Sequence, residues 1–214
     1  MTHFYIAKNV LNNSLWTNKN KSQYYLGAIS PDSVQFRKEY DKKESHICFS
    51  NEAWGFVTNN DEWEKYVIKF IKDNYKKTDK DFVFGYGIHI LADIQNNIKV
   101  WTPFRLNNIG KNFNELHKTA YEENMQIDKI LFQMCNFKSE LFEALRNSAE
   151  FDFLDLIKKE DMENIKYNLL NIQYNNIFNN TENNIIMRLD DILGFINSAT
   201  EYIIETFQKK NIIK

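Results

Sequence analysis

Two side chains that can bind a metal stand four positions apart in the most apolar stretch of the chain. Residues 82–94 are apolar on most sides, which predicts a buried helix, and His89 and Asp93 lie within it. At this spacing they project from one helix face, one turn apart. A buried carboxylate needs a partner, so the pair predicts a His–Asp hydrogen bond or part of a metal site. Taken alone, the pair favours the hydrogen bond.

The other candidate ligands stand at the edges of further apolar segments. His3 begins the first predicted helix, Asp32 follows Pro31 at the end of an apolar segment, and His46 lies between a charged loop and an apolar patch. Zinc accepts imidazole nitrogen and carboxylate oxygen, so these residues are expected to converge with His89 and Asp93 on one site. The fourth histidine, at position 117, has charged neighbours and is expected to be a solvated helix residue.

Apolar residues spaced by three and four predict the helices that would position these side chains. The expected helices are 2–11, 60–74, 82–94, 112–134, 138–147, 151–172 and 184–209. A short apolar segment is expected to stop at Pro31, and residues 38–44 and 96–110 are expected to be loops.

Two glycines interrupt the predicted helix that carries His89. Gly85 and Gly87 each lower helix stability by about 1 kcal/mol relative to alanine. Their presence suggests that another backbone or a ligand approaches closely, and they lie where room beside a metal site would be needed.

The composition restricts the fold and the class of protein. The chain has 214 residues, a net charge of -2, 43% hydrophobic residues, 6 Gly and 2 Pro. This disfavours a disordered chain, a turn-rich β-sandwich and a dedicated nucleic-acid binder, and it predicts one all-α domain over residues 1–214. Two cysteines, no signal peptide and no apolar run of about 20 residues favour a cytoplasmic protein without a membrane span.

The ordered motifs resemble those of the zinc-dependent phospholipase C family, whose fold is shared with the single-strand-specific zinc nucleases. The motifs are Thr2-His3, Leu26-Gly27-x-x-x-Pro31-Asp32, Ser45-His46 and Phe84-Gly85-Tyr86-x-x-His89-x-x-x-Asp93. The chain is most similar to the bacterial branch that lacks a secretion signal. The resemblance implies a helical bundle with a metal-site core in residues 1–135 and C-terminal helices, 136–214, packed on it.

The same resemblance implies the ligands and the chemistry. Asp32, His46, His89 and Asp93 would form one zinc site, and Asp93 would bridge to a metal that His3 also binds. Zinc-assisted hydrolysis of a phosphate ester would follow, with Asp32 as general base. The substrate would be a small-molecule or lipid phosphate ester, whereas nucleic acid is disfavoured because the chain has no basic excess.

The sequence departs from the family pattern after Asp93, where the expected histidine is missing. His117, Glu122 and Glu123 are the residues left for a second metal site, although His117 and Glu122 are poorly matched on a helix. Two alternatives therefore stay open. One is a helical protein that a metal stabilises without turnover, and the other is an interaction module that uses the amphipathic helix 184–209.

Overall fold

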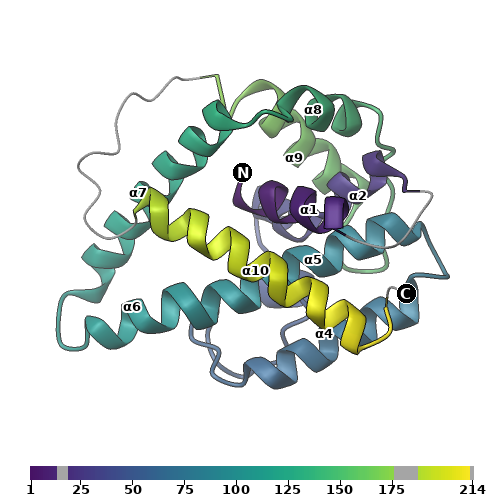
Figure 1. Ribbon diagram of the computed structural model, residues 1–214. Helices are drawn as coiled ribbons and strands as arrows, with labels where there is room; N and C mark the ends of the chain where they lie inside the picture. Colours follow the sequence, from purple (N-terminus) through teal and green to yellow (C-terminus); the bar gives the residue numbers. More distant parts are fainter. Residues whose placement is uncertain (14–18, 176–187, 213–214) are drawn as a thin grey trace.

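Most of the described chain is helical in the computed structural model, which describes residues 1–13, 19–175 and 188–212 (Figure 1). Its elements are α1 (Thr2–Asn13), α2 (Lys21–Gly27), the 3-10 helix η1 (Ser30–Phe36), α3 (Lys42–Ser45), α4 (Asn60–Asn74), α5 (Lys80–Asn96), the π-helical turn η2 (Asn97–Trp101), α6 (Thr102–Asn107), α7 (Phe113–Met134), α8 (Lys138–Arg146), α9 (Lys159–Asn171) and α10 (Leu189–Lys209). Within the described ranges, the only β-type pairing is an isolated bridge between Phe153 and Ile157. The all-α prediction is confirmed.

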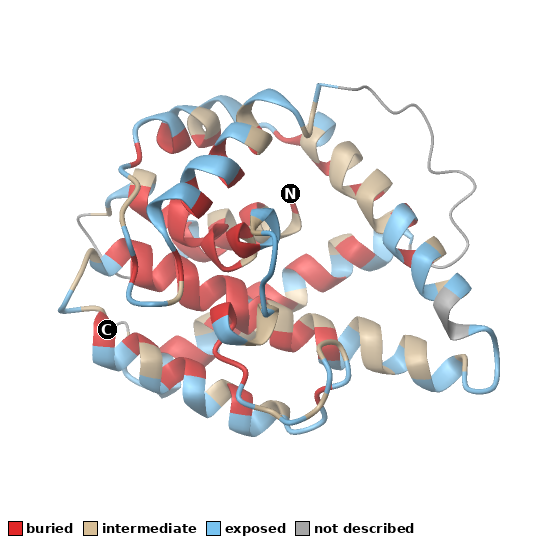
Figure 2. Ribbon diagram, turned by 180° about the vertical axis from the view of Figure 1, so that it is seen from behind, coloured by how far each residue is buried: buried red, intermediate tan, exposed pale blue. Residues whose placement is uncertain are grey.

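Helix α5 runs through the middle of the molecule and is buried on nearly all sides (Figure 2). It packs against α1, α2, α4 and α10. Asp79 caps its start, because the carboxylate accepts hydrogen bonds from the backbone N–H groups of Asp81 and Phe82 at 2.9 and 3.1 Å. The helix that carries His89 and Asp93 is therefore the most enclosed element of the fold.

The two glycines of α5 allow other protein atoms to approach closely. Close approach by another backbone was one of the two explanations expected for them. A Cβ atom on Gly85 would lie 2.1 Å from the backbone oxygen of Tyr24, and one on Gly27 would lie 2.1 Å from that of Phe82. Helices α2 and α5 thus meet backbone to backbone. A Cβ on Gly87 would instead meet the Ile71 side chain at 2.3 Å. The space beside these glycines is filled by protein, and it does not serve as room at a metal site.

Helix α10 crosses α1 and α5 with its apolar face turned inward (Figure 1). Ile192, Ile196, Ile203 and Phe207 are buried there. The predicted start of this helix at residue 184 lies outside the described residues. None of the described helices combines the length and the apolar character that a membrane span requires.

Two predicted boundaries were wrong, and both errors have a physical reason. Residues 96–110 were expected to be a loop, but η2 and α6 continue the helix, because Pro103 falls in the first turn of α6, where its missing N–H is tolerated. Residues 151–172 were expected to be one helix, but α9 starts only at Lys159. Before it, the chain folds back so that Phe153 is buried and its N–H donates to the Ile157 oxygen at 2.8 Å.

The charged segment 38–44 also differs from the loop that was expected. It ends in the short helix α3, whose first turn is capped by Asp41 through a 2.8 Å hydrogen bond from the Lys43 N–H. Next to it, Pro31 starts the 3-10 helix η1 after α2 has ended at Gly27. Together α3 and η1 form the rim beside one face of α5.

Candidate metal centre

All five predicted ligands lie in one cluster, although they come from four separate elements. His3 comes from α1, Asp32 from η1, His46 from the residue that ends α3, and His89 and Asp93 from α5. Two overlapping groups have their ligand atoms within 4.8 Å of one another. The first is His3, His89 and Asp93, and the second is Asp32, His46 and His89. These side chains can hold a metal ion.

The rings of His46 and His89 are fixed by backbone carbonyl groups. The Nδ1–H of His46 donates to the Lys42 oxygen and that of His89 donates to the Ala28 oxygen, each at 2.8 Å. A carbonyl oxygen only accepts, so Nδ1 of each ring carries a proton, and in this tautomer Nε2 is the atom left to bind a ligand. Both Nε2 atoms are buried without a hydrogen-bond partner. This is the arrangement of metal-binding histidines, whose second nitrogen is held by a carbonyl.

The two carboxylates face these unpartnered nitrogens. His46 Nε2 lies 3.2 Å from one oxygen of Asp93 and 3.7 Å from one oxygen of Asp32. His89 Nε2 lies 3.7 Å from an oxygen of each carboxylate. Two nitrogen and two oxygen donors therefore surround the same small space, which is the donor set that zinc and similar cations take.

His3 covers the cluster from the α1 side. Its ring stacks on that of His89 with centroids 3.8 Å apart, and its Nε2 lies 3.4 Å from Asp93 Oδ1. Its Nδ1 is buried without a hydrogen bond. Asp93 is thus shared between His3 on one side and His46 on the other, as a bridging carboxylate would be.

The charges of the cluster favour a cation. Burial lowers the pKa of His89 to about 3 and also lowers the pKa of His3, so both rings are neutral at neutral pH. Burial acts to raise the pKa of both carboxyl groups, but the pKa of Asp93 lies below its ordinary value, and for Asp32 the Lys42 ammonium is the main group that overcomes burial and lowers the pKa. Two ionised carboxylates therefore face one ammonium group.

Lys42 is a residue of the site that the sequence analysis missed. Its Nζ donates to Asp32 Oδ1 at 2.7 Å, while its backbone oxygen accepts the His46 hydrogen bond. Burial acts to lower the pKa of Lys42, but Asp32 raises it overall. The spacing of four between Lys42 and His46, after the capping residue Asp41, is the sequence signal that could have identified it.

One side of the cluster is closed and the other reaches solvent. The side chains of His46 and His89 are buried, whereas those of His3, Asp32 and Lys42 are 27%, 28% and 30% exposed. The Trp54 ring meets His46 edge-on at 4.7 Å between centroids and lies 5.9 Å from the Lys42 ammonium. The Trp63 indole N–H donates to the His46 oxygen at 2.8 Å, which holds the α3 end in place.

The residues named for a second metal site do not form one in the part of the chain that the structure describes. Neither group of closely spaced ligand atoms there includes His117, Glu122 or Glu123. His117 is exposed and packs on Trp101 at 5.1 Å between ring centroids, and Glu122 lies 3.9 Å from the Lys118 ammonium. Glu123 is buried elsewhere on α7.

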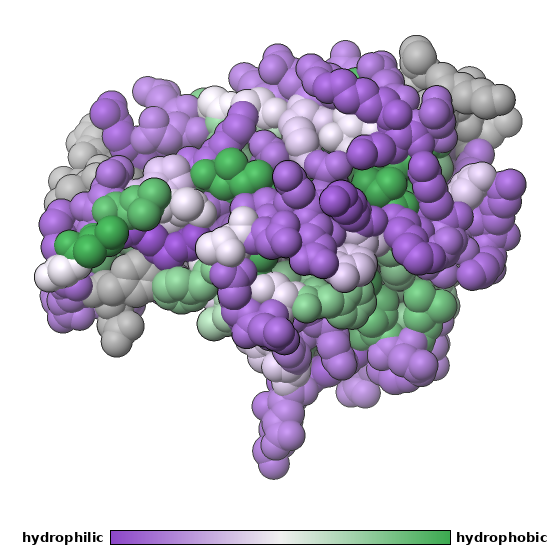
Figure 3. Space-filling model, turned by 90° about the horizontal axis from the view of Figure 1, so that it is seen from below, coloured by the Kyte–Doolittle hydropathy of each residue, from purple (hydrophilic) through white to green (hydrophobic). Residues whose placement is uncertain are grey.

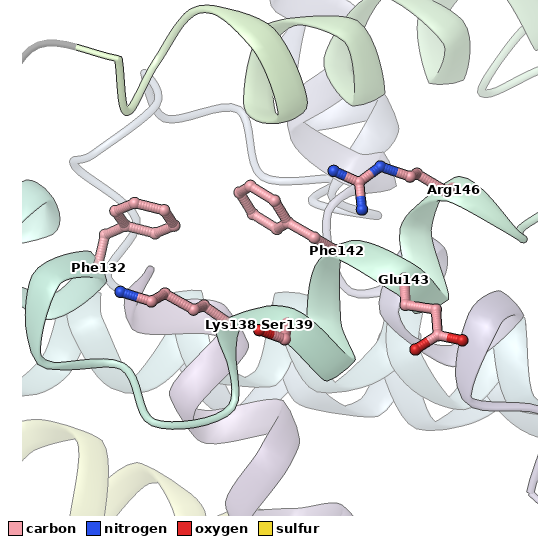
Figure 4. Close-up of a pocket in the computed structure, with 6 residues that line it drawn as sticks. All are labelled: Phe132, Lys138, Ser139, Phe142, Glu143 and Arg146. Carbon is pink, nitrogen blue, oxygen red and sulfur yellow. The ribbon is translucent and has the colours of Figure 1, made fainter.

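A separate hollow lies on the surface between α7 and α8, away from the cluster (Figure 4). It is lined by Phe132, Lys138, Ser139, Phe142, Glu143 and Arg146. The Phe132 and Phe142 rings stack at 5.5 Å, and none of the five cluster residues lines this hollow.

Comparison with protein-family models, curated proteins and solved structures finds no match to this chain.

Proposed function

We propose that the chain is a zinc-dependent hydrolase that acts on a phosphate ester, as the resemblance to zinc-dependent phospholipase C implies. The observation that supports this most strongly is the pair of buried Nε2 atoms of His46 and His89. Neither has a hydrogen bond, and both face Asp32 and Asp93. Leaving two buried acceptors unsatisfied is costly, and a metal ion that takes their lone pairs would remove that cost.

His46, His89, Asp32 and Asp93 would hold the ion, and His3 would share Asp93. Zinc bound there would supply Lewis acidity and lower the pKa of water toward 7. The chain's own contribution lies in Asp32, whose carboxylate is part-exposed and can accept a proton from a water molecule on the solvent side. Lys42 orients that carboxylate through Oδ1 and keeps Oδ2 turned to His89.

The exposed side of the cluster favours catalysis over a purely structural role. A structural zinc site is closed by protein ligands, whereas a catalytic site keeps one position for water or substrate. Here the part-exposed His3, Asp32 and Lys42 form an open side. A phosphate oxygen can approach from this side, where the Lys42 ammonium would offset its negative charge.

The test is hydrolysis of bis-p-nitrophenyl phosphate by zinc-loaded protein, with zinc content measured on the same sample. We expect turnover that Asp32→Asn abolishes while Asp155→Asn, a matched change at an exposed aspartate, leaves it intact. Zinc-loaded protein that hydrolyses neither this diester nor p-nitrophenyl phosphate would overturn the proposal.

A second candidate function is that of a helical protein stabilised by a metal without turnover. The observation that favours it is that the cluster joins α1, η1, α3 and α5, so an ion there would tie four elements together. Stabilisation by zinc in a protein that hydrolyses no phosphate ester would support this candidate. Turnover abolished by Asp32→Asn would reject it.

A further inference from the structure

The chain from η2 through α6 to the start of α7 forms a hairpin that projects from the body of the molecule (Figure 1). Helix α6 contributes no buried residue to the core. The turn after it contains Gly110, whose φ of 81° lies in the left-handed region. Within the hairpin tip, residues 102–112, Phe104 packs on the core, whereas Leu106, Asn107 and residues 109–112 are exposed.

Two large aliphatic side chains are exposed at the hairpin tip. Leu106 is 63% exposed and Ile109 is 77% exposed, the highest value among the large hydrophobic residues in the described ranges. They line one surface hollow together with Phe56, which is 47% exposed. In Figure 3, hydrophobic atoms appear at the left, where Figure 1 places the end of this hairpin. Clustered exposed apolar side chains of this kind mark an interaction surface.

The same segment is basic in a chain that is acidic overall. Between Asp93 and Glu115 there is no acidic residue, but there are three cations, Lys99, Arg105 and Lys111. The whole chain has a net charge of -2. The exposed Lys111 lines the hollow that Leu106 and Ile109 also line; Arg105 lines it too, but its guanidinium is bound to the Gly55 oxygen and lies near the Glu52 carboxylate. Apolar side chains next to cations form a surface that complements anionic headgroups above an acyl layer.

The hairpin is also connected to the metal centre. The Arg105 guanidinium donates to the Gly55 oxygen and lies 5.1 Å from the Phe56 ring centroid. Trp54, the residue before Gly55, meets His46 of the cluster edge-on. The loop that contains Trp54 and Gly55 is therefore held against the hairpin at Arg105.

We propose that the hairpin tip docks on an anionic lipid bilayer, with Leu106 and Ile109 in the interface and Lys111 among the headgroups. The proposal rests on exposure and charge, and it does not depend on the metal centre or on the proposed hydrolysis. Two apolar side chains and a few cations give reversible attachment that weakens as salt screens the charges.

The test is sedimentation of the full chain with vesicles of phosphatidylglycerol and phosphatidylcholine in equal parts, and with phosphatidylcholine alone. We expect binding to the anionic vesicles that high salt weakens. The double variant Leu106→Ser/Ile109→Ser should lower the partition coefficient by about tenfold or more. The control is Leu154→Ser/Ile172→Ser, which removes the same residue types from exposed positions elsewhere and should leave binding unchanged.

Three results would overturn the proposal. The first is no sedimentation above that of protein alone, and the second is equal binding by the Leu106→Ser/Ile109→Ser variant and the original chain. The third is self-association in solution that this variant abolishes, which would assign the tip to an interface between copies of the chain.

Discussion

The imidazole rings of His3 and His89 stack with their centroids 3.8 Å apart and their planes 11° from parallel. His89 lies in the buried helix α5, whereas His3 is part-exposed in the first turn of α1. The stack places the His3 imidazole beside Asp93. It thereby adds a nitrogen donor from α1 to the donors that η1, α3 and α5 supply. His3 therefore contributes to the site in two ways: its ring packs on that of His89, and its Nε2 lies beside the Asp93 carboxylate.

Replacing His3 by phenylalanine separates these roles. His3→Phe keeps an aromatic ring over His89 but removes both nitrogens, so the unfolding free energy of the metal-free protein should change little. Zinc affinity should fall by about 10- to 100-fold, because a donor beside Asp93 is lost. Competition titration with a chromogenic chelator measures this change. His117→Phe, a matched change outside the cluster, should leave the affinity intact; equal affinities for all three proteins would remove His3 from the site.

Lys42 should substitute in part for the metal in the metal-free protein. Lys42→Met removes the ammonium that offsets Asp32 and Asp93, so the metal-free protein should unfold at a lower temperature. Zinc would then restore more stability than it does in the original chain, and the interval between the two melting temperatures should widen. Calorimetry with zinc and with a chelator measures this interval. An unchanged interval, equal to that of the exposed control Lys65→Met, would contradict the role of Lys42.

The close crossing of α2 and α5 predicts a large loss of stability for a substitution at Gly85, and Gly194 on α10 serves as the control. Gly85→Ala places a Cβ 2.1 Å from the Tyr24 oxygen, a backbone atom that cannot move aside, so we expect a loss of about 3 kcal/mol in unfolding free energy. Gly194→Ala on α10 meets nothing within 4 Å and should gain about 0.5–1 kcal/mol from helix propensity. Urea unfolding measures both. Similar effects of the two changes would show that the helices are not in backbone contact.

Glu140 should make stability depend on pH through its ion pairs. Its carboxylate lies 2.8 Å from the ammonium groups of Lys8 on α1 and Lys21 on α2. Hydrogen bonds from Lys21 and Lys8 lower the pKa of Glu140 below its ordinary value of 4.5. Its stabilising effect is therefore present above pH 4.5 and is lost as the pH falls through the lowered pKa.

The measurement is urea unfolding of the original chain and of Glu140→Gln between pH 7 and pH 3. We expect a difference of about 0.5–1 kcal/mol at pH 7, reduced by solvent screening, that shrinks toward zero at low pH. Glu143→Gln, at an exposed position of the same helix, should show no such trend. A difference that stays constant with pH would contradict the assignment.

Helical periodicity accounts for only part of the site that could be predicted from sequence, since His3, Asp32 and His46 were predicted from their places beside apolar segments and from the order of the motifs. The spacing of His89 and Asp93 places them on one face of an apolar helix, and the structure contains that helix and that face. Lys42 was missed because it lay in a segment read as a charged loop. Its contact with Asp32 depends on how α3 and η1 pack together, which periodicity does not report.

The boundary errors have a similar origin. The Asn96-Asn97 pair and Pro103 are ordinary helix breakers, yet the π-helical turn η2 absorbs the change and the helix continues. Phe153 fits a helical pattern by spacing but fills a core position against Phe82 and Tyr86 from a non-helical turn. Tertiary packing decided these segments, and local propensity did not.

Metal analysis of the purified chain shows whether the cluster of His3, Asp32, His46, His89 and Asp93 binds zinc. After incubation with zinc and removal of excess ion, we expect about one zinc per chain or more. His89→Ala should lose most of it, and His117→Ala, a control outside the cluster, should retain it. Less than about half a zinc per chain, unchanged by His89→Ala, would show that the cluster is not a zinc site.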